Sequence, residues 1–262
     1  MVDTIGELSK PLAGKRVLVA GGEGEIGSVI SAGLAADGAD VAVAGLEQAK
    51  CQEVADRLRT DTNRTAGYGF NITDPSSVDG LVDEIVQDWG GIDVLVNCVG
   101  ILKINLAENF DAAEFRAVVD INLTGAFLLT QAVGKAMIKG GEGGRVVHMT
   151  SVRGHVGLAI GGFAAYGASK AGVHLLIKQL ASEWGKHQIS INGVGSGFVR
   201  TALSEAALQN PDFARMVAER TPLGRVADIQ EVANTAIYFA GPRSSFVTGQ
   251  ILYVDGGLSA SQ

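Results

Sequence analysis

The feature that most constrains the fold of this chain is a regular alternation of short β-branched runs with helical stretches. Strands are expected where the runs are short and rich in Val, Ile and Ala, over residues 15–20, 40–44, 65–71, 92–97, 145–150, 189–194 and 250–254. Helices are expected where apolar residues follow a helical period, over residues 25–37, 47–60, 75–89, 111–139, 164–187, 201–219 and 228–240. A strand such as residues 92–97 (IDVLVN) is apolar on both faces, which is typical of a parallel sheet covered by helices. The sequence therefore predicts an α/β fold, a doubly wound parallel sheet of about seven strands with helices on both faces.

The chain shows no internal boundary. Across its 262 residues there is no linker, low-complexity tract or shift in composition, and a chain of this length can bury one large core. We therefore expect residues 1–262 to form a single domain, with residues 1–13 as an N-terminal extension before the first strand.

Composition and charge exclude several classes of protein. Apolar residues make up 47% and charged residues 19% of the chain, which excludes a disordered polypeptide. The formal net charge is −7 and no Lys/Arg-rich run occurs, so no nucleic-acid partner is expected. Residues 1–10 lack the apolar core of a signal peptide, and no stretch reaches the ~18 uninterrupted apolar residues of a membrane span. No membrane association is expected either.

The cysteines and histidines carry no metal pattern. Cys51 and Cys98 allow at most one disulfide and lack metal-ligand spacing. Two reduced thiols in a cytoplasmic protein are the simpler interpretation. The four histidines are scattered along the chain without neighbouring carboxylates or thiols in a repeated pattern. We therefore expect a cytoplasmic protein without a metal ion.

A glycine-rich turn follows the first predicted strand directly. The chain has 36 glycines, about twice the usual share, and residues 21–27 read GGEGEIG at the start of a predicted helix. Gly22, Gly24 and Gly27 satisfy the G-x-G-x-x-G pattern. Such a turn lets the backbone approach a pyrophosphate while the helix start offers free N–H groups. The alternative is a tight strand–helix turn that binds nothing. In this position the pattern favours a Rossmann-like dinucleotide site.

Tyr166 and Lys170 stand four residues apart on one face of a predicted helix. A free phenol, with a pKa near 10, is a poor acid–base group at neutral pH. A nearby ammonium group favours the phenolate and lowers this pKa. The alternative is a half-buried tyrosine beside a solvated lysine, since this spacing also occurs by chance.

Taken together, these motifs resemble those of the short-chain dehydrogenase/reductase family over residues 14–260. Residues 97–100 (NCVG) stand where the family has N-N-A-G after the fourth strand. Ser151 in the MTSV run matches the family's catalytic serine, and Asn122 in the DINL run matches its active-site asparagine. Residues 221–257 look like the branch of the 3-oxoacyl reductases. Several motifs in the right order make the resemblance far more specific than any one of them.

The resemblance implies an oxidoreductase that transfers a hydride between NAD(P) and a secondary alcohol or ketone. Tyr166 would be the acid–base residue, and Lys170 would lower its pKa and hold the nicotinamide ribose. Ser151 would donate a hydrogen bond to the substrate oxygen, where charge develops during the reaction. Asn122 would position a water in the proton relay. The alternative is a catalytically weak or silent dinucleotide-binding protein with a sensor or assembly role.

The resemblance also implies a set of residues that contact the dinucleotide. These are Gly21, Glu23, Gly24, Glu25, Ile26, Gly27, Gly45, Leu46, Asn71, Ile72, Asn97, Val99, Gly100, Tyr166, Lys170, Val199 and Thr201.

Several of these positions depart from the family pattern. In the first turn Glu25 replaces a glycine, which brings a carboxylate close to an anionic pyrophosphate unless it points outward. Asn71 replaces the usual Asp of the adenine site. The position that distinguishes the ribose of NAD from that of NADP falls at Gly45, where neither an Asp nor a basic residue is present. Because Glu23, Glu25 and Glu47 would repel a 2′-phosphate, we favour NAD, with NADP left open.

The substrate is not readable from the sequence beyond its class. The family implies a substrate lid over residues 200–222, whose apolar side chains are compatible with an aliphatic or ring ketone. The same side chains would also fit a surface helix packed on the core. The family further implies a homotetramer in which the predicted helices 111–139 and 164–187 pair between subunits.

Overall fold

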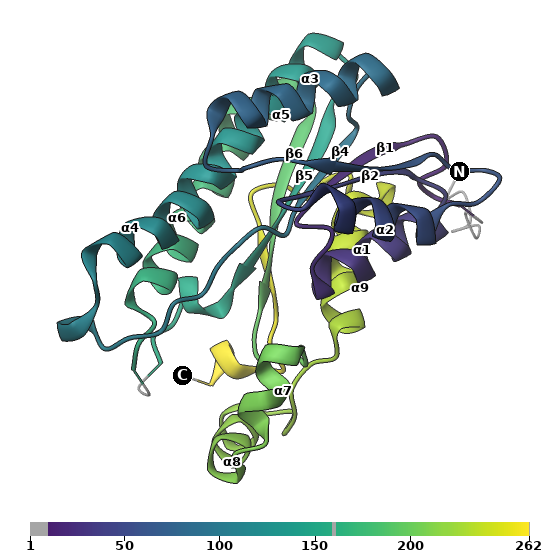
Figure 1. The fold of residues 1–262 in the computed structure, drawn as a ribbon. Helices are drawn as coiled ribbons and strands as arrows, with labels where there is room; N and C mark the ends of the chain where they lie inside the picture. The colour runs from purple at the N-terminus through teal and green to yellow at the C-terminus, as the bar shows by residue number, and fades with distance from the viewer. Residues whose placement is uncertain (1–9, 159–160, 262) are drawn as a thin grey trace.

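The computed structural model describes residues 10–158 and 161–261, and it contains one seven-stranded sheet in the order β3-β2-β1-β4-β5-β6-β7 (Figure 1). Every neighbouring pair of strands is parallel. The strands are β1 Arg16–Ala20, β2 Asp40–Gly45, β3 Thr65–Gly69, β4 Val94–Asn97, β5 Gly144–Ser151, β6 Ile189–Ser196 and β7 Ile251–Val254. The expected doubly wound α/β fold is confirmed. Of the predicted N-terminal extension, residues 1–9 lie outside the described part.

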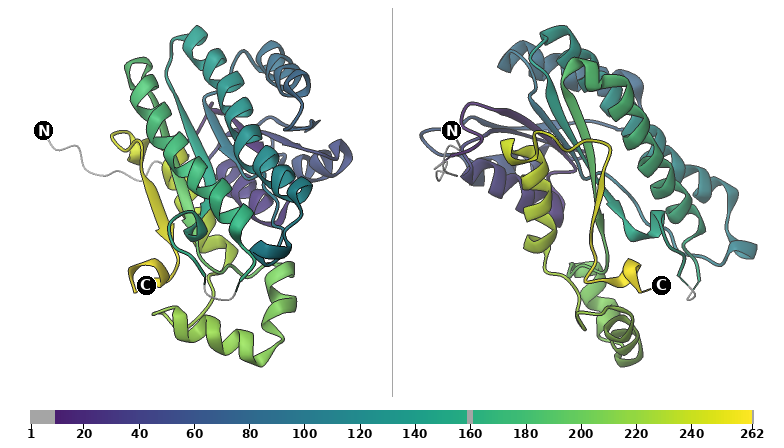
Figure 2. Two further views of the ribbon diagram at one scale, coloured as in Figure 1. Left: turned by 90° about the vertical axis from the view of Figure 1, so that its left-hand side faces the viewer. Right: turned by 180° about the vertical axis from the view of Figure 1, so that it is seen from behind.

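Helices cover both faces of the sheet, as Figures 1 and 2 show. The helices are α1 Glu25–Ala36, α2 Gln48–Leu58, α3 Pro75–Trp89, α4 Ala112–Val119, α5 Gly125–Gly140, α6 Ala164–Trp184, α7 Ala202–Leu208, α8 Pro211–Arg220 and α9 Ile229–Ala240. One face packs α1, α2 and α9 around a core that includes Ile30, Leu34 and Phe239. The other packs α3, α5 and α6 around a core that includes Ile85, Leu129 and Ile177. Each face therefore has a core of its own, which explains why the central strands are apolar on both sides.

Two of the expected helices are divided. The stretch 111–139 consists of α4, a π turn over Asp120–Thr124, and α5. The stretch 201–219 consists of α7 and α8, because Pro211 begins the second helix and the Asn210 side chain caps it by accepting from the backbone N–H groups of Asp212 and Phe213. Periodicity alone does not reveal either division.

The helical stretch Ala112–Gly140 is long and apolar enough, by length and composition, to cross a membrane. Half of its most apolar 18-residue window is buried inside the structure. Residues such as Leu129 and Val133 belong to the core between the sheet and helices α3, α5 and α6. A core helix passes the same test of length and composition, so the stretch is weak support for a membrane span.

The topology places a crevice at the carboxyl ends of β1 and β4. The chain leaves β1 toward β2 on one side, while β4 adds to the other side of β1. Ligands of open α/β sheets bind at this switch point. Helices α7 and α8 follow β6 and project beyond the same end of the sheet (Figures 1 and 2).

Candidate active site

Three elements bring the four expected catalytic residues to the carboxyl ends of the central strands. Ser151 is the last residue of β5, and Tyr166 and Lys170 lie in the first two turns of α6. Asn122 lies in the π turn between α4 and α5. The side chains of Ser151, Asn122 and Lys170 are buried, and that of Tyr166 is half-buried. The cluster is therefore fixed by regular structure and packing.

The Asn122 side chain ties the loop after β4 to α6. Its Oδ1 accepts from the Ile101 N–H at 2.8 Å, and its Nδ2 donates to the Ile101 carbonyl at 2.9 Å and to Ser169 Oγ at 3.1 Å. Both amide hydrogens are used, so a water held by this side chain must donate to Oδ1. A π turn is a frequent feature of functional sites, and here it directs this amide inward.

The Lys170 ammonium group is buried beside the other catalytic side chains. Its Nζ donates to the Met149 carbonyl at 3.0 Å and lies 5.6 Å from the ring centre of Tyr166. A Cβ built on Gly100 would lie 3.4 Å from Nζ and 3.3 Å from Asn122 Oδ1, so both groups converge on this glycine. Burial lowers the pKa of Lys170 to about 8.

The acidity of Tyr166 differs from the expectation. Burial raises the pKa of its phenol, while hydrogen bonding to Ser151 and the charge of Arg153 act in the opposite direction. In this structure the Lys170 ammonium is directed at the Met149 carbonyl, and the burial of the phenol outweighs the favourable charges. A phenolate here would need further stabilisation from a bound ligand.

The glycine-rich turn after β1 has the geometry of an anion site. Gly21 adopts a φ of +71°, and a Cβ on Gly27 would overlap the Gly21 carbonyl oxygen, so no larger residue fits where α1 meets the turn. The N-cap residue of α1 is Gly24, which provides no side-chain cap. The first N–H groups of α1, including that of Ile26, therefore remain for a ligand.

Glu25 is directed away from this turn. Both of its carboxylate oxygens accept from the Ala202 N–H, at 3.0 and 3.1 Å, at the start of α7. The side chain thus joins α1 to α7 across the site. Of the two orientations considered from the sequence, the structure has the outward one, with the carboxylate held by another helix.

At the end of β2 the carboxylate of Glu23 takes the space beside Gly45. Its Oε1 accepts from the Leu46 N–H at 3.1 Å. The Leu46 side chain is 75% exposed next to this carboxylate. Glu47 is paired with Lys50 at 2.6 Å. Of Glu23, Glu25 and Glu47, which were expected to repel a 2′-phosphate, only Glu23 places its carboxylate beside the end of β2.

The remaining expected dinucleotide contacts lie at the carboxyl ends of β1, β4 and β6 or in the segments that follow them, with two exceptions. Asn97 Oδ1 accepts from the Val99 N–H at 3.1 Å and shapes the turn that leads to Gly100. Thr201 caps α7 beside Val199.

The two exceptions lie after β3. The Asn71 side chain accepts from the N–H and hydroxyl of Thr73, at 3.1 and 2.8 Å. The Ile72 side chain is buried in the core and packs against Gly125. Neither side chain is directed at the crevice in this structure, because local turn formation and core packing hold them.

A pocket of about 320 Å³ opens beside Ser151 and Tyr166. Its walls come from the loop after β4, from the turn after β5, and from α7 and α8, and they are mostly apolar. Its lining includes Leu102, Ile104, Leu158, Phe163, Phe198, Leu208 and Phe213. Helices α7 and α8 therefore border the expected substrate position, as the predicted lid requires.

Among the lining residues that sequence reasoning missed, Arg153 carries a charge. Its guanidinium is half-buried, lies 5.9 Å from the ring centre of Phe198, and donates to the Gly157 carbonyl at 2.9 Å. Burial lowers its pKa. A charged residue two positions after Ser151, in a loop rich in glycine, was the signal that could have identified it.

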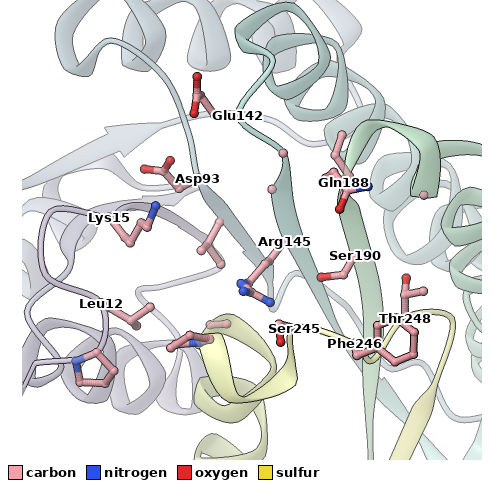
Figure 3. A pocket seen from close by; sticks show the side chains of 18 residues that line it. Leu12, Lys15, Asp93, Glu142, Arg145, Gln188, Ser190, Ser245, Phe246 and Thr248 are labelled. Carbon is pink, nitrogen blue, oxygen red and sulfur yellow. The ribbon is translucent and has the colours of Figure 1, made fainter. Parts of the chain in front are cut away.

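A wider hollow of about 650 Å³ lies at the opposite end of the sheet, where the strands begin (Figure 3). Arg145 points into it, and Lys15, Asp93, Ser190 and Phe246 surround it. It holds none of the expected catalytic residues. It therefore lies away from the candidate catalytic residues.

The thiols and histidines form no metal site in the part of the chain that the structure describes. No group of three or more His, Cys, Asp or Glu side chains is placed to hold a metal ion among residues 10–158 and 161–261. Cys51 and Cys98 are both free, and burial raises the pKa of each thiol to about 12. Both thiols stay protonated at neutral pH.

Comparison with known proteins gives matches over nearly the whole chain. A family model described as enoyl-(acyl carrier protein) reductase matches residues 20–259. Gluconate 5-dehydrogenase of Gluconobacter oxydans is 33% identical over 250 residues, which cover 95% of this chain and 96% of the relative. The 3-oxoacyl-[acyl-carrier-protein] reductase of Escherichia coli is 35% identical over 245 residues, or 94% of this chain and 97% of the relative. A crystal structure of gluconate 5-dehydrogenase from Burkholderia cenocepacia, in complex with NADP and tartrate, has a TM-score of 0.90 at 32% identity and covers 97% of this chain and 98% of that one.

Proposed function

Because this chain belongs to the short-chain dehydrogenase/reductase family, it is an NAD(P)-dependent oxidoreductase acting on secondary alcohols or ketones, and we propose that Tyr166 is its acid–base residue. The observation that carries this proposal is that Ser151 and Tyr166 both line the pocket, with Lys170 Nζ 5.6 Å from the ring centre of Tyr166. The alternative, a silent dinucleotide-binding protein, has no support from the relatives, which are named as enzymes.

Each candidate catalytic residue has a separate role in the reaction at the substrate oxygen. The dinucleotide supplies the hydride acceptor or donor when it is bound. During oxidation Tyr166 removes the hydroxyl proton, and during reduction it returns it. The Ser151 hydroxyl donates a hydrogen bond to the same oxygen and stabilises the charge that develops there. Lys170 holds the ribose beside Tyr166, and Asn122 positions a water through Oδ1.

The dinucleotide is proposed to lie along the crevice from the turn after β1 to Lys170. The amide groups at the start of α1 would hold the pyrophosphate. The contacts outlined from the family pattern are retained, except those of the Asn71 and Ile72 side chains, which are held elsewhere in this structure. We infer NAD as the preferred form, although a related gluconate 5-dehydrogenase has been crystallised with NADP.

The pocket supports a substrate with an apolar body and one anionic group. Its walls are mostly aliphatic and aromatic, and Arg153 is the charged side chain in its lining. A half-buried guanidinium with remaining donors is suited to a carboxylate. We therefore propose a small hydroxy acid or its keto form as substrate.

Turnover with a panel of substrates tests these assignments. Carboxylated and neutral secondary alcohols and ketones of equal size are assayed with each dinucleotide. Tyr166→Phe is expected to lower kcat by about 10²–10⁴-fold while retaining dinucleotide binding. Lack of turnover with every compound, or an unchanged rate in Tyr166→Phe, would contradict the proposal. If the carboxylated compounds have no higher kcat/KM than the neutral compounds of equal size, this result would contradict only the proposed role of Arg153.

The location and assembly of the protein are also proposals. Two free, protonated thiols suit a reducing compartment, which favours the cytoplasm. Exposed apolar side chains on α4, α5 and α6 favour a homotetramer in which these helices pair.

A further inference from the structure

We propose that Glu23 recognises the adenosine ribose of the dinucleotide, and that it thereby selects NAD over NADP. In a doubly wound nucleotide site this task falls to an acidic residue at the end of the second strand. Here that position is Gly45, and the carboxylate comes from the turn after β1 instead. The inference rests on the proposed function, since it concerns the same dinucleotide.

The space beside Gly45 is filled by Glu23. A Cβ built on Gly45 would overlap both carboxylate oxygens of Glu23. Gly45 does not have a positive φ, so its backbone conformation does not require glycine. The absence of a side chain at this position is therefore explained by space, and the two residues form a complementary pair.

The Glu23 carboxylate has acceptor capacity that the protein does not use. Oε1 accepts one hydrogen bond, from the Leu46 N–H at 3.1 Å, which fixes the carboxylate at the strand end. Oε2 is buried and has no hydrogen-bond partner among the described residues. A carboxylate offers about four acceptor positions, and leaving a buried one empty is unfavourable. The two vicinal hydroxyls of a ribose are donors of the kind that this carboxylate lacks.

Neighbouring groups support the same discrimination. The Lys50 ammonium, which could attract a phosphate, is held by Glu47 at 2.6 Å. The Cys51 thiol lies close to Glu23. Burial and the charge of this carboxylate raise the pKa of the thiol to about 12, so it stays neutral at pH 7. A 2′-phosphate on the ribose would lie next to the Glu23 carboxylate. The repulsion between two negative charges in contact would disfavour binding of NADP.

The test measures binding of nucleotides without any substrate or turnover. Calorimetric titration compares ADP-ribose with 2′-phospho-ADP-ribose, which differ only in the phosphate. The wild type is expected to bind ADP-ribose more tightly by about tenfold or more. Glu23→Gln is expected to reduce this ratio several-fold, because it removes the charge and keeps the shape.

Relocating the carboxylate gives a sharper test. Gly45→Asp alone is expected to weaken both nucleotides, because its side chain collides with Glu23. The double variant Glu23→Ser/Gly45→Asp is expected to recover the preference for ADP-ribose, since one carboxylate again faces the ribose. Asp212→Asn in α8, whose carboxylate pairs locally with Arg215, is the matched control and should leave the ratio unchanged. Circular dichroism melting confirms that each variant is folded.

Several outcomes would overturn the inference. Tighter binding of 2′-phospho-ADP-ribose than of ADP-ribose by the wild type excludes the inference. An affinity ratio of the two nucleotides that is the same in Glu23→Gln as in the wild type also excludes it. A double variant that fails to recover the ratio also contradicts it. These results are independent of turnover, so an inactive enzyme with the expected ratios would refute the proposed function and leave the role of Glu23 standing.

Discussion

At the scale of single residues, Lys170 is a charged group kept where its burial is unfavourable for stability. Its ammonium is buried in α6 with the Met149 carbonyl as its hydrogen-bond partner. Desolvation lowers its pKa from 10.5 to about 8. The protonated form therefore destabilises the folded chain at neutral pH. Such a residue is retained for its chemistry.

Replacing Lys170 by Met is expected to stabilise the protein at pH 7 by about 1–3 kcal/mol while abolishing turnover. Below pH 8 the folded and unfolded forms are both protonated, and the folded form carries the buried charge. Between pH 8 and 10.5 the unfolded form binds more protons, so the stability of the wild type rises with pH. Urea unfolding at pH 7, 8 and 9 measures both effects. A Lys170→Met variant less stable than the wild type at pH 7 would contradict this account.

At the scale of elements, the Glu25 carboxylate links α1 to α7 close to the proposed site of the pyrophosphate. The carboxylate accepts from the N–H of Ala202, at the start of a helix that borders the pocket. Glu25 is also the first residue of α1, so its charge lies near the N–H groups that are proposed to hold the pyrophosphate. The position of α7 in this structure is thus stabilised by a charge that disfavours the ligand.

Glu25→Gln is expected to tighten NADH binding several-fold and to loosen α7. The amide removes the negative charge near the pyrophosphate and weakens the charge-assisted bond to α7. Fluorescence titration with NADH measures the first effect, and hydrogen exchange of residues 202–208 measures the second. Asp212→Asn in α8 is the control, since its carboxylate pairs locally with Arg215. Binding that is no tighter in Glu25→Gln would show that the carboxylate is harmless to the ligand.

The sequence predicted the elements well where hydrophobic pattern and capping agree. Helix α3 begins at Pro75 as expected, because Asp74 caps it and Pro is favoured at its first position. The strand predicted over 92–97 begins two residues later, at Val94, and the side chain of Asp93, just before it, pairs with Arg16. The π turn at Asn122 was not predicted, since its residues keep a helical apolar period.

Within the candidate site, local motifs placed the candidate catalytic residues at the ends of their elements, and tertiary contacts decided the rest. Ser151 and Tyr166 could be placed because each lies in a recognisable run at an element boundary. The partners of Glu23 and Glu25 could not, because they lie 23 and 177 residues away in sequence. Arg153 was missed for a similar reason, since its neighbour Phe198 comes from a distant loop.

At the scale of the whole molecule, two groups among the exposed apolar side chains lie on neighbouring elements. Phe115, Phe127 and Leu175 lie on α4, α5 and α6, which form one outer layer of the fold in Figure 1. Leu252 on β7 and Phe246 just before it are exposed at the edge of the sheet. Single exposed apolar residues are normal, but two groups on neighbouring elements suit two interfaces. Two different two-fold interfaces generate a tetramer.

The wild type is therefore expected to form a tetramer of about 108 kDa from chains of 27.1 kDa. Leu175, 68% exposed on α6, would be buried at one of the interfaces. Leu175→Glu is expected to give dimers, because a charge buried without a partner is strongly unfavourable, while the interface at β7 is left intact. Light scattering after size exclusion measures both masses. Leu46→Glu, which changes another exposed leucine at the end of β2, outside these helices, should remain tetrameric. A monomeric wild type, or a Leu175→Glu variant of unchanged mass, would show that the α4–α6 layer does not pair between subunits.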